Sequence, residues 1–258
     1  MKAYSKRSNN LQGRVTCPGD ESISQRSVII GSLLDEDIQI SGFLFAEDPL
    51  SSIGALRNLG HEIEIDDGIV SVKNSRKNIS DQKVSCNLGN SGTGFRLISG
   101  LIAGQEIDAE LTGDDSLSKR PMNRIIKPLN EMGAKIESNK GCAPLTFNKS
   151  QLVKEFLYEM PIASAQLKSC LLLAAISSNM KLTLHENKVS RDHTERMLKY
   201  FGANITLKNY EGGQNITLDT NNKLVAKDDS VKGHIFSESY LNLAALLTKE
   251  SSITMKDV

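Results

Sequence analysis

An internal repeat is the feature that most constrains how this chain of 258 residues can fold. Three segments carry apolar residues at the three-to-four spacing of a helix, and each ends in an apolar residue followed by glycine. The closing glycines, Gly60, Gly133 and Gly202, are 73 and 69 residues apart, and glycine at this point suits a left-handed C-terminal cap. An alternating segment, typical of a strand, follows each glycine. The predicted helices span residues 48–60, 120–133 and 191–202, and the strands after them span residues 61–65, 134–136 and 203–207.

A second type of predicted helix lies between the first at the same period. These helices are rich in small residues and apolar on nearly every face, which is typical of buried helices. They span Ser24–Leu34, Ser91–Ala103 and Ser164–Ile176, and further short strands are predicted at 38–40, 69–72, 110–112 and 182–184. Ser91 and Ser164 stand where an N-cap is expected. The chain is therefore predicted to be an α/β protein built from three strand–helix–strand–helix–strand–strand units of about 70 residues each.

A fourth unit begins at residue 231 and contains only a helix, predicted at 237–247, and a strand, predicted at 252–255. Because such a fragment cannot bury its own apolar face, we expect it to associate with another surface or to aggregate. The expected organisation is one complete lobe at residues 20–230 and an incomplete second lobe made from residues 1–19 and 231–258. Within the complete lobe the units are expected at about 20–85, 86–155 and 156–230.

The composition disfavours nucleic-acid and membrane proteins. Thirty-one basic residues balance 31 acidic residues, so no net charge draws the chain toward nucleic acid or an anionic membrane. Seven phenylalanines, five tyrosines and no tryptophan leave few side chains on which bases could stack. The longest apolar run, Cys170–Ile176, is far shorter than the roughly 20 residues of a membrane span. Residues 1–11 lack the apolar core of a signal peptide.

The cysteines and histidines carry no disulfide or metal signature. The four cysteines form no Cys-x-x-Cys pair, which in a chain of this size indicates reduced thiols in the cytoplasm. The four histidines lack the spacing of metal ligands. We therefore expect a cytoplasmic protein that uses no metal and no other cofactor.

Five motifs carry the candidate binding residues. They begin at Pro18, Leu88, Leu111, Ala163 and Ser190 and read PGDESISQR, LGNSGTGFR, LTGDDSLSKRPM, ASAQLK and SRDHTERML. In this order and at this spacing they make nearly the whole chain similar to the 5-enolpyruvylshikimate-3-phosphate synthase family. The resemblance implies an inside-out α/β barrel with two lobes of three units each, closing over a cleft. It also implies transfer of the enolpyruvyl group from phosphoenolpyruvate to the 5-hydroxyl of shikimate 3-phosphate, in aromatic amino acid biosynthesis by the shikimate pathway.

The resemblance also implies which residues bind these substrates, whose negative charges suit guanidinium groups and the amides of helix N-termini. The residues implied at the phosphoenolpyruvate end are Asn90, Gly92, Thr93, Arg96 and Arg120. Those implied for shikimate 3-phosphate are Ser22, Arg26, Ser164, Gln166 and Ser190, with Arg191 as a further candidate and Glu21 at a family contact position. Taken singly, each motif is more typical of a helix cap or a solvated side chain, so the assignment depends on all five occurring together.

The chain departs from the family pattern at three positions. Glu21 stands where the family carries a lysine that touches anionic groups of both substrates, and Gln25 stands where a histidine is usual. His234 stands where the family carries an aspartate. The change at Glu21 reverses a charge beside an anion site, which is unfavourable if that site is desolvated.

The chain matches the N-terminal part of the family pattern, somewhat more than half of it. The family reaction adds a hydroxyl to the enol carbon and then eliminates phosphate, which requires an acid and a base, and both come from the second lobe. No catalytic residue is therefore expected in this chain, and weak or absent turnover is expected from it alone. The expected partners are the two substrates, together with a C-terminal lobe supplied in trans or a second copy bound through the incomplete lobe.

Two alternatives stay open. One is an inactive homologue that binds a ligand or a partner, which Glu21 and His234 favour. The other is an enolpyruvyl transferase for a different acceptor, such as UDP-N-acetylglucosamine. The sister enzyme for that acceptor carries a reactive cysteine on a loop corresponding to residues 114–118, where this chain has none. Cys86 is interpreted as a core residue of a strand.

Overall fold

Three four-stranded sheets with the same strand order form the body of the molecule. A computed structural model describes residue 4, residues 10–76 and residues 83–256. In each sheet the first two strands are parallel and the other neighbours are antiparallel. The sheet of the middle unit contains β5 (Val84–Asn87), β6 (Ala109–Thr112), β8 (Cys142–Asn148) and β7 (Lys135–Asn139). That of the third unit contains β9 (Glu155–Met160), β10 (Lys181–Glu186), β12 (Gly213–Asp219) and β11 (Asn204–Tyr210).

The sheet of the first unit receives its leading strand from a distant part of the chain. Its order is β13 (Asp229–Ser230), β2 (Ile38–Ser41), β4 (Ile69–Arg76) and β3 (His61–Asp66). β13 pairs with β2 in parallel, as β5 does with β6 and β9 with β10. Residues 229–230, which were predicted to end the third unit, therefore lie in the sheet of the first unit. This pairing brings the end of the third unit back to the start of the first.

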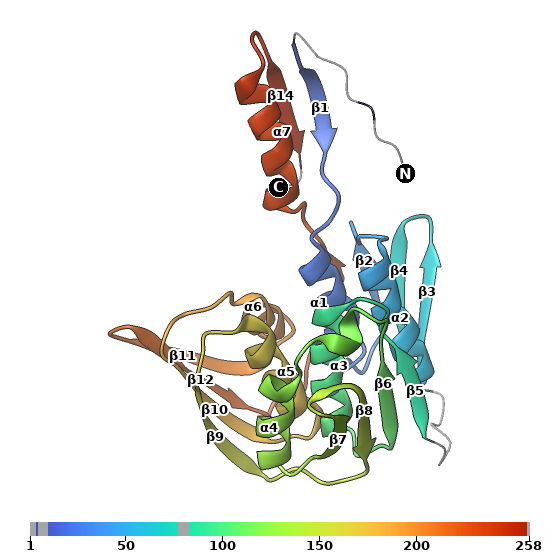
Figure 1. The fold of residues 1–258 in the computed structure, drawn as a ribbon, viewed down its shortest axis with the longest axis vertical. Coiled ribbons are helices and arrows are strands. Elements are labelled where there is room, and N and C mark those ends of the chain that lie inside the picture. The colour runs from blue at the N-terminus through green and yellow to red at the C-terminus, as the bar shows by residue number, and fades with distance from the viewer. Residues whose placement is uncertain (1–3, 5–9, 77–82, 257–258) are drawn as a thin grey trace.

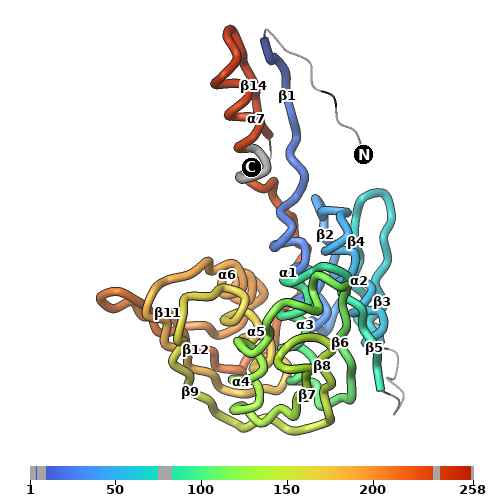
Figure 2. Tube along the Cα trace, viewed as in Figure 1, coloured from blue at the N-terminus to red at the C-terminus, as the bar shows by residue number. Residues whose placement is uncertain are grey.

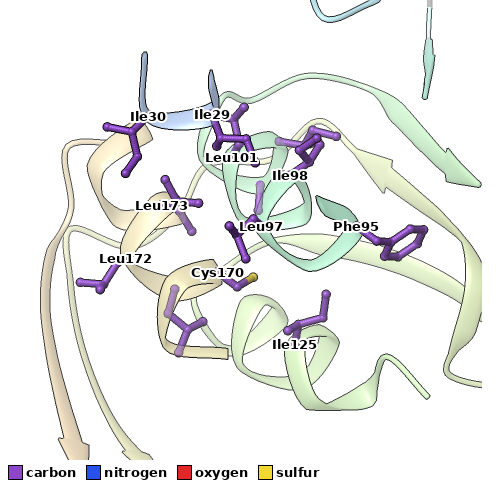
Figure 3. Packing of buried hydrophobic residues seen from close by; sticks show 14 of the residues in the cluster. Ile29, Ile30, Phe95, Leu97, Ile98, Leu101, Ile125, Cys170, Leu172 and Leu173 are labelled. Carbon is purple, nitrogen blue, oxygen red and sulfur yellow. The ribbon is translucent and has the colours of Figure 1, made fainter. Parts of the chain in front are cut away.

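Three buried helices pack at the centre of this body, as predicted. They are α1 (Glu21–Gly31), α3 (Gly92–Gly104) and α5 (Ala165–Ser177), and Figure 3 shows side chains from all three meeting in one apolar cluster. The predicted caps are present: the side chain of Ser91 accepts a hydrogen bond from the amide of Gly94 at 3.1 Å, and that of Ser164 accepts one from Leu167 at 3.3 Å. These serines satisfy amides that would otherwise be left unpaired at buried helix ends.

The amphipathic helices are α2 (Glu47–Asn58), α4 (Asn123–Glu131) and α6 (His193–Tyr200). The glycines that follow them, Gly60, Gly133 and Gly202, have φ values of 88°, 108° and 87°, so the predicted left-handed caps are confirmed. Two of these helices begin later than the sequence pattern predicted. Arg120 is extended, with ψ at 134°, because the residue before a proline disfavours the helical conformation. Arg191 also precedes its helix, so both arginines lie on the segments that lead into α4 and α6.

The contact between α3 and α5 depends on a glycine. A Cβ atom placed on Gly100 would overlap the carbonyl oxygen of Cys170, whereas one placed on Gly54 in α2 would meet no atom within 4 Å. Gly100→Ala should therefore push two buried helices apart and lower the free energy of unfolding by roughly 1–3 kcal/mol. Gly54→Ala should leave stability unchanged or raise it by about 0.4–1 kcal/mol. Denaturant unfolding followed by circular dichroism compares the two variants, and equal stability would contradict the close helix contact.

An arm projects from the body (Figures 1 and 2). It consists of α7 (Ile235–Leu247) and a parallel pair formed by β1 (Gln12–Thr16) and β14 (Ser252–Lys256). Four large side chains of α7 are more than half exposed: Tyr240, Leu243, Leu246 and Leu247. The prediction of an uncovered apolar helix face is confirmed. Among the described residues, no helix has both the length and the apolar composition needed to cross a membrane.

Candidate functional site

Two arginines converge on the N-terminus of α3. A Cβ atom on Gly92 would lie 2.9 Å from Nη1 of Arg120 and 3.2 Å from Nη1 of Arg96. Both guanidinium groups therefore lie against the backbone at the first residue of a 13-residue helix. A helix N-terminus carries partial positive charge, so three sources of positive potential meet here. The pKa of Arg96 is lowered by burial and then by Arg124 and Arg120. An anionic ligand between the guanidinium groups would relieve this repulsion.

Side-chain hydrogen bonds hold this cluster in place. Nη1 of Arg96 donates to Oε1 of Gln166 at 2.9 Å and to the carbonyl oxygen of Gly92 at 3.0 Å. Nε2 of Gln166 donates to Oγ1 of Thr93, also at 2.9 Å. Arg120 donates to Oδ1 of Asn90. The structure thus brings together six of the residues chosen from sequence, and Gln166 ties the start of α5 to the start of α3.

A second cluster surrounds Arg26 in α1, which is only 3% exposed. Its Nη1 donates to the carbonyl oxygen of Ser22 at 2.8 Å, its Nε to Oγ1 of Thr194 at 2.8 Å, and its Nη2 to Oγ of Ser169 at 3.1 Å. Burial lowers the pKa of Arg26 to about 10, with nearby Arg191 adding to the effect, so the guanidinium stays charged at neutral pH. Two of its five N–H groups have no partner among these three bonds.

Helix α5 joins the two clusters. Its cap, Ser164, also accepts a hydrogen bond from Nη1 of Arg124 at 3.4 Å. Gln166 reaches the arginines at α3, and Ser169, one turn further on, reaches Arg26. Ser190 lies between β10 and α6, where its amide donates to Oε1 of Glu186 at 3.0 Å. The expected site residues therefore gather around the N-termini of three buried helices and two loops.

One residue of the site, Arg124, was not identified from sequence. Arg124 follows Arg120 by four residues and lies in the first turn of α4, so a search for further arginines after that motif could have found it. Gln25 was noted from sequence as a departure from the family pattern, but its contacts could not be foreseen because its partners are distant in sequence. Its Oε1 accepts from Oγ of Ser91 at 3.0 Å and from Oγ of Ser52 at 3.3 Å. Gln25 therefore links α1, α2 and the cap of α3.

Two of the departures from the family pattern lie close together. Glu21 begins α1, and its pKa is raised by burial and then by Asp48 and Asp20, while His234 opposes the shift. Nε2 of His234 lies 3.2 Å from Oδ2 of Asp20. Asp20 and His234 lie on the two chain segments that connect the body to the arm. An antiparallel bridge between Gly19 and Gly233 pairs these segments. Glu21 thus lies close to two other carboxylates, Asp20 and Asp48, and to the imidazole of His234 at the N-terminus of α1.

The raised pKa of Glu21 predicts how stability depends on pH. The folded chain holds this proton more tightly than the unfolded chain does. The stabilising contribution of Glu21 is thus fully present below its unfolded pKa of 4.5 and is lost as the pH rises through the raised folded value. Relative to Glu21→Gln, which does not titrate, the wild-type chain should gain free energy of unfolding between about pH 7 and about pH 4. Denaturant unfolding across this range measures the difference, and a constant difference would contradict the raised pKa of Glu21.

The cysteines offer no reactive thiol at this site. Cys86 is fully buried in β5, with Sγ 3.5 Å from the carbonyl oxygen of Ala55, and burial raises its pKa to about 12. Its interpretation as strand core is confirmed. Within the described ranges, no group of three or more cysteine, histidine or acidic residues is arranged to hold a metal ion.

The fold and the site define a class: an α/β protein of repeated units that gathers arginines near the N-termini of buried helices. The model of the EPSP synthase (3-phosphoshikimate 1-carboxyvinyltransferase) family matches residues 5–258. The chain therefore belongs to the EPSP synthase family, and the resemblance inferred from its motifs is confirmed. Two solved structures of EPSP synthase from Acinetobacter baumannii superpose with a TM-score of 0.82 at 36% identity, over 96% of this chain and 56% and 57% of theirs. This similarity confirms the predicted fold class.

Curated relatives give the same family and show how much of it this chain spans. A 3-phosphoshikimate 1-carboxyvinyltransferase from Thermoanaerobacter sp. (strain X514) is 42% identical over 254 residues, which are 98% of this chain and 59% of the relative. The protein of the same name from Vesicomyosocius okutanii subsp. Calyptogena okutanii (strain HA) is 42% identical over 96% of this chain and 56% of its own length. The chain thus spans less than two thirds of the length of these relatives.

Proposed function

We propose that this chain supplies the shikimate 3-phosphate half of an enolpyruvyl transfer site and part of the phosphoenolpyruvate site. The observation that carries the proposal is the convergence of Arg96 and Arg120 on the N-terminus of α3, beside a second cationic cluster around Arg26. Phosphoenolpyruvate and shikimate 3-phosphate each carry a phosphate and a carboxylate. Two neighbouring cationic clusters suit two such anions held side by side.

In this proposal the two clusters have different ligands. Arg96 and Arg120 bind phosphoenolpyruvate with the help of the amides at the start of α3. Ser22, Ser164 and Ser190 donate hydroxyl hydrogen bonds to shikimate 3-phosphate, for which Arg26 and Arg191 supply positive charge. The remaining expected contacts are Asn90, Gly92, Thr93 and Gln166, which shape the boundary between the two ligands, and Glu21, which lies beside it.

The chemistry follows from this placement. The 5-hydroxyl of shikimate 3-phosphate loses its proton and adds to the enol carbon of phosphoenolpyruvate, whose methylene gains a proton. Phosphate then leaves the tetrahedral adduct together with a proton of the new methyl group, which re-forms the double bond. Adding the hydroxyl requires a base, and forming the methyl group of the adduct requires an acid. The residues of this chain bind the two anions and hold the hydroxyl near the enol carbon, which lowers the entropic part of the barrier. The acid and the base belong, in this proposal, to the part of the relatives that this chain does not span.

The arm provides a surface for that part. The exposed apolar face of α7 is too large to remain in water without cost, and we propose that a C-terminal lobe covers it. Self-association through the same face is the second candidate. All four cysteines are free, which agrees with the proposed location in the cytoplasm.

The names of the relatives favour this function over both alternatives. The curated relatives and solved neighbours described above are all named for the same transferase. The deeply buried thiol of Cys86 gives no support to a transferase that relies on a reactive cysteine.

Titration calorimetry of shikimate 3-phosphate into the purified chain tests the proposal. Measurable saturable binding is expected, and shikimate, which lacks the phosphate, should bind much more weakly. Ser22→Ala should weaken binding about tenfold, because a hydrogen bond to a charged group is lost, while the exposed Ser85→Ala in β5 should not change it. If shikimate 3-phosphate binds no better than shikimate, the proposed acceptor site is wrong.

A further inference from the structure

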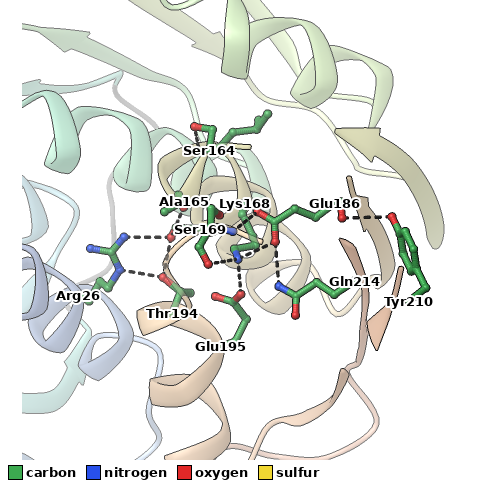
Figure 4. A network of polar contacts seen from close by, with 12 residues as sticks. Arg26, Ser164, Ala165, Lys168, Ser169, Glu186, Thr194, Glu195, Tyr210 and Gln214 are labelled. Atoms are coloured by element: carbon green, nitrogen blue, oxygen red, sulfur yellow. Dashed lines mark hydrogen bonds and ion pairs between the residues drawn. The ribbon is translucent and has the colours of Figure 1, made fainter. Parts of the chain in front are cut away.

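A lysine and two glutamates form a fully enclosed ion cluster beside the proposed site. Nζ of Lys168 lies 2.6 Å from Oε1 of Glu195 and 3.1 Å from Oε2 of Glu186, and none of the three side chains is more than 1% exposed. Figure 4 shows the cluster between α5, the end of β10 and the first turn of α6. Buried ion pairs of this kind are weak contributors to stability, because desolvation offsets the attraction. The presence of such a cluster beside the proposed site therefore indicates a role other than stabilising the fold.

The two carboxylates of this cluster are not equivalent. Burial raises the pKa of Glu186, but hydrogen bonds involving Ser190, Gln214 and Lys168 together bring it below the usual range. Burial raises the pKa of Glu195, and Lys168 only partly opposes that. Glu186 is thus the carboxylate with more hydrogen bonds and the ionised partner of Lys168, while Glu195 is the carboxyl that accepts a proton more readily.

Glu186 and Lys168 both hold the backbone of Ser190. Oε1 of Glu186 accepts the amide hydrogen bond of Ser190 at 3.0 Å, and Nζ of Lys168 lies 3.5 Å from its carbonyl oxygen. Oε2 of Glu186 is itself fixed by Nε2 of Gln214 in β12 at 2.8 Å. The segment between β10 and α6 has no helix or strand of its own. The positions of the proposed substrate-binding residues in this segment therefore depend on the buried ion cluster, because no helix or strand holds the segment.

The ion cluster also adjoins the other residues proposed to bind shikimate 3-phosphate. Lys168 follows Gln166 by two residues in α5. Its neighbour Ser169 lies 2.6 Å from Oγ1 of Thr194, and both hydroxyls accept hydrogen bonds from Arg26. Figure 4 shows these bonds beside the ion cluster. The two sets of contacts are joined by the chain itself, because Lys168 and Ser169 are adjacent in α5 and Thr194 and Glu195 are adjacent in α6. A displacement of the loop at Ser190 would therefore change its distance from residues on both α1 and α5.

We propose that Lys168 and Glu186 are positioning residues, which hold the Ser190–Arg191 segment at the distance from α5 that the phosphorylated acceptor requires. The proposal rests on the proposed function, because it assigns the segment a ligand. Glu195 has a different role. It shares the positive charge of Lys168 but, unlike Glu186, it has no hydrogen bond to the backbone of Ser190 among the contacts described.

Two matched variants distinguish a positioning role of Glu186 from a general contribution of the ion cluster to stability. Glu186→Leu and Glu195→Leu remove the same group, and each leaves Lys168 with one carboxylate. Only Glu186→Leu removes the acceptor of the Ser190 amide. Hydrogen exchange of that amide in the free chain should accelerate at least tenfold in Glu186→Leu and stay within twofold of wild type in Glu195→Leu. Titration calorimetry should show affinity for shikimate 3-phosphate reduced at least tenfold in Glu186→Leu and unchanged within twofold in Glu195→Leu.

The outcomes distinguish this inference from the function on which it rests. Equal effects of the two variants on exchange and on affinity would overturn the positioning role, because they would reflect a general loss of stability. If the exchange rates differ as expected but the wild-type chain does not bind shikimate 3-phosphate, the proposed function fails and the assigned ligand fails with it. Should Glu186→Leu not fold, Glu186→Gln keeps the shape of the side chain. Its amide cannot accept from both Ser190 and Gln214 in the same way, so wild-type exchange and affinity in that variant would also overturn the inference.

Discussion

The chain alone is expected to show no detectable conversion of shikimate 3-phosphate and phosphoenolpyruvate, and a C-terminal segment supplied in trans is expected to raise the rate at least ~10³-fold. General acid and base groups typically contribute ~10²–10⁴-fold, and preorganised charge stabilisation adds a comparable factor. The proposed site has arginines for binding, yet no acid or base has been assigned in this chain. The matched Thermoanaerobacter relative is covered over 59% of its length, so the remaining 41% (100 less 59) defines the segment to be supplied.

Release of phosphate, measured with and without this segment, checks the expectation. Arg120→Gln should abolish the gain, because the guanidinium group at the start of α3 is lost while the face of α7 stays intact. Binding of the segment should also lower the exposure of Leu246 to chemical footprinting. Turnover by the chain alone at the rate of the mixture would contradict the assignment of the acid and the base to the other segment.

Replacing Glu21 by lysine is expected to tighten the binding of shikimate 3-phosphate about tenfold, which corresponds to about 1.4 kcal/mol. Burial, and then the neighbouring carboxylates of Asp48 and Asp20, raise the pKa of the wild-type carboxylate. The substitution changes the local charge by two units next to a site for a ligand that carries both a phosphate and a carboxylate. The gain should shrink as salt is added, since Glu21 is only partly buried and its interactions are partly screened.

Glu21→Gln is the matched control for this substitution. It removes the negative charge without adding a positive one, and about half of the gain in binding free energy is expected from it. Titration calorimetry at low and moderate salt compares the three chains. Weaker binding by Glu21→Lys than by the wild-type chain would show that Glu21 makes a favourable contact with the ligand, contrary to the electrostatic argument.

Local signals explain what could be predicted from the sequence. Ser91 and Ser164 were recognisable as caps because the hydrogen bond of an N-cap spans only three residues. The glycines after the amphipathic helices were recognisable because a left-handed cap tolerates few other residues. The repeat then extended these local predictions to the whole body, since each unit has the same alternation of helix types.

Long-range contacts explain what could not be predicted. β13 consists of Asp229 and Ser230, whose side chains carry no strand signature, and only its pairing with β2 defines it. Lys168 sits in a helix that is apolar on nearly every face, so its burial was foreseeable but its partners, 18 and 27 residues away, were not. The contacts of Gln25 could not be predicted for the same reason, because its acceptor atom links helices that are far apart in the sequence.

The most direct test of the proposed site is a titration of the ¹⁵N-labelled chain with shikimate 3-phosphate, followed by amide chemical shifts. Saturable changes are expected at Ser22, Gln166 and Ser190, with little change on the exposed face of α7. A second addition of phosphoenolpyruvate should then shift the amides of Gly92 and Thr93 at the start of α3. Saturable changes confined to other parts of the chain, or none at concentrations that saturate a full-length relative, would contradict the proposal that these helix N-termini form the substrate half-site.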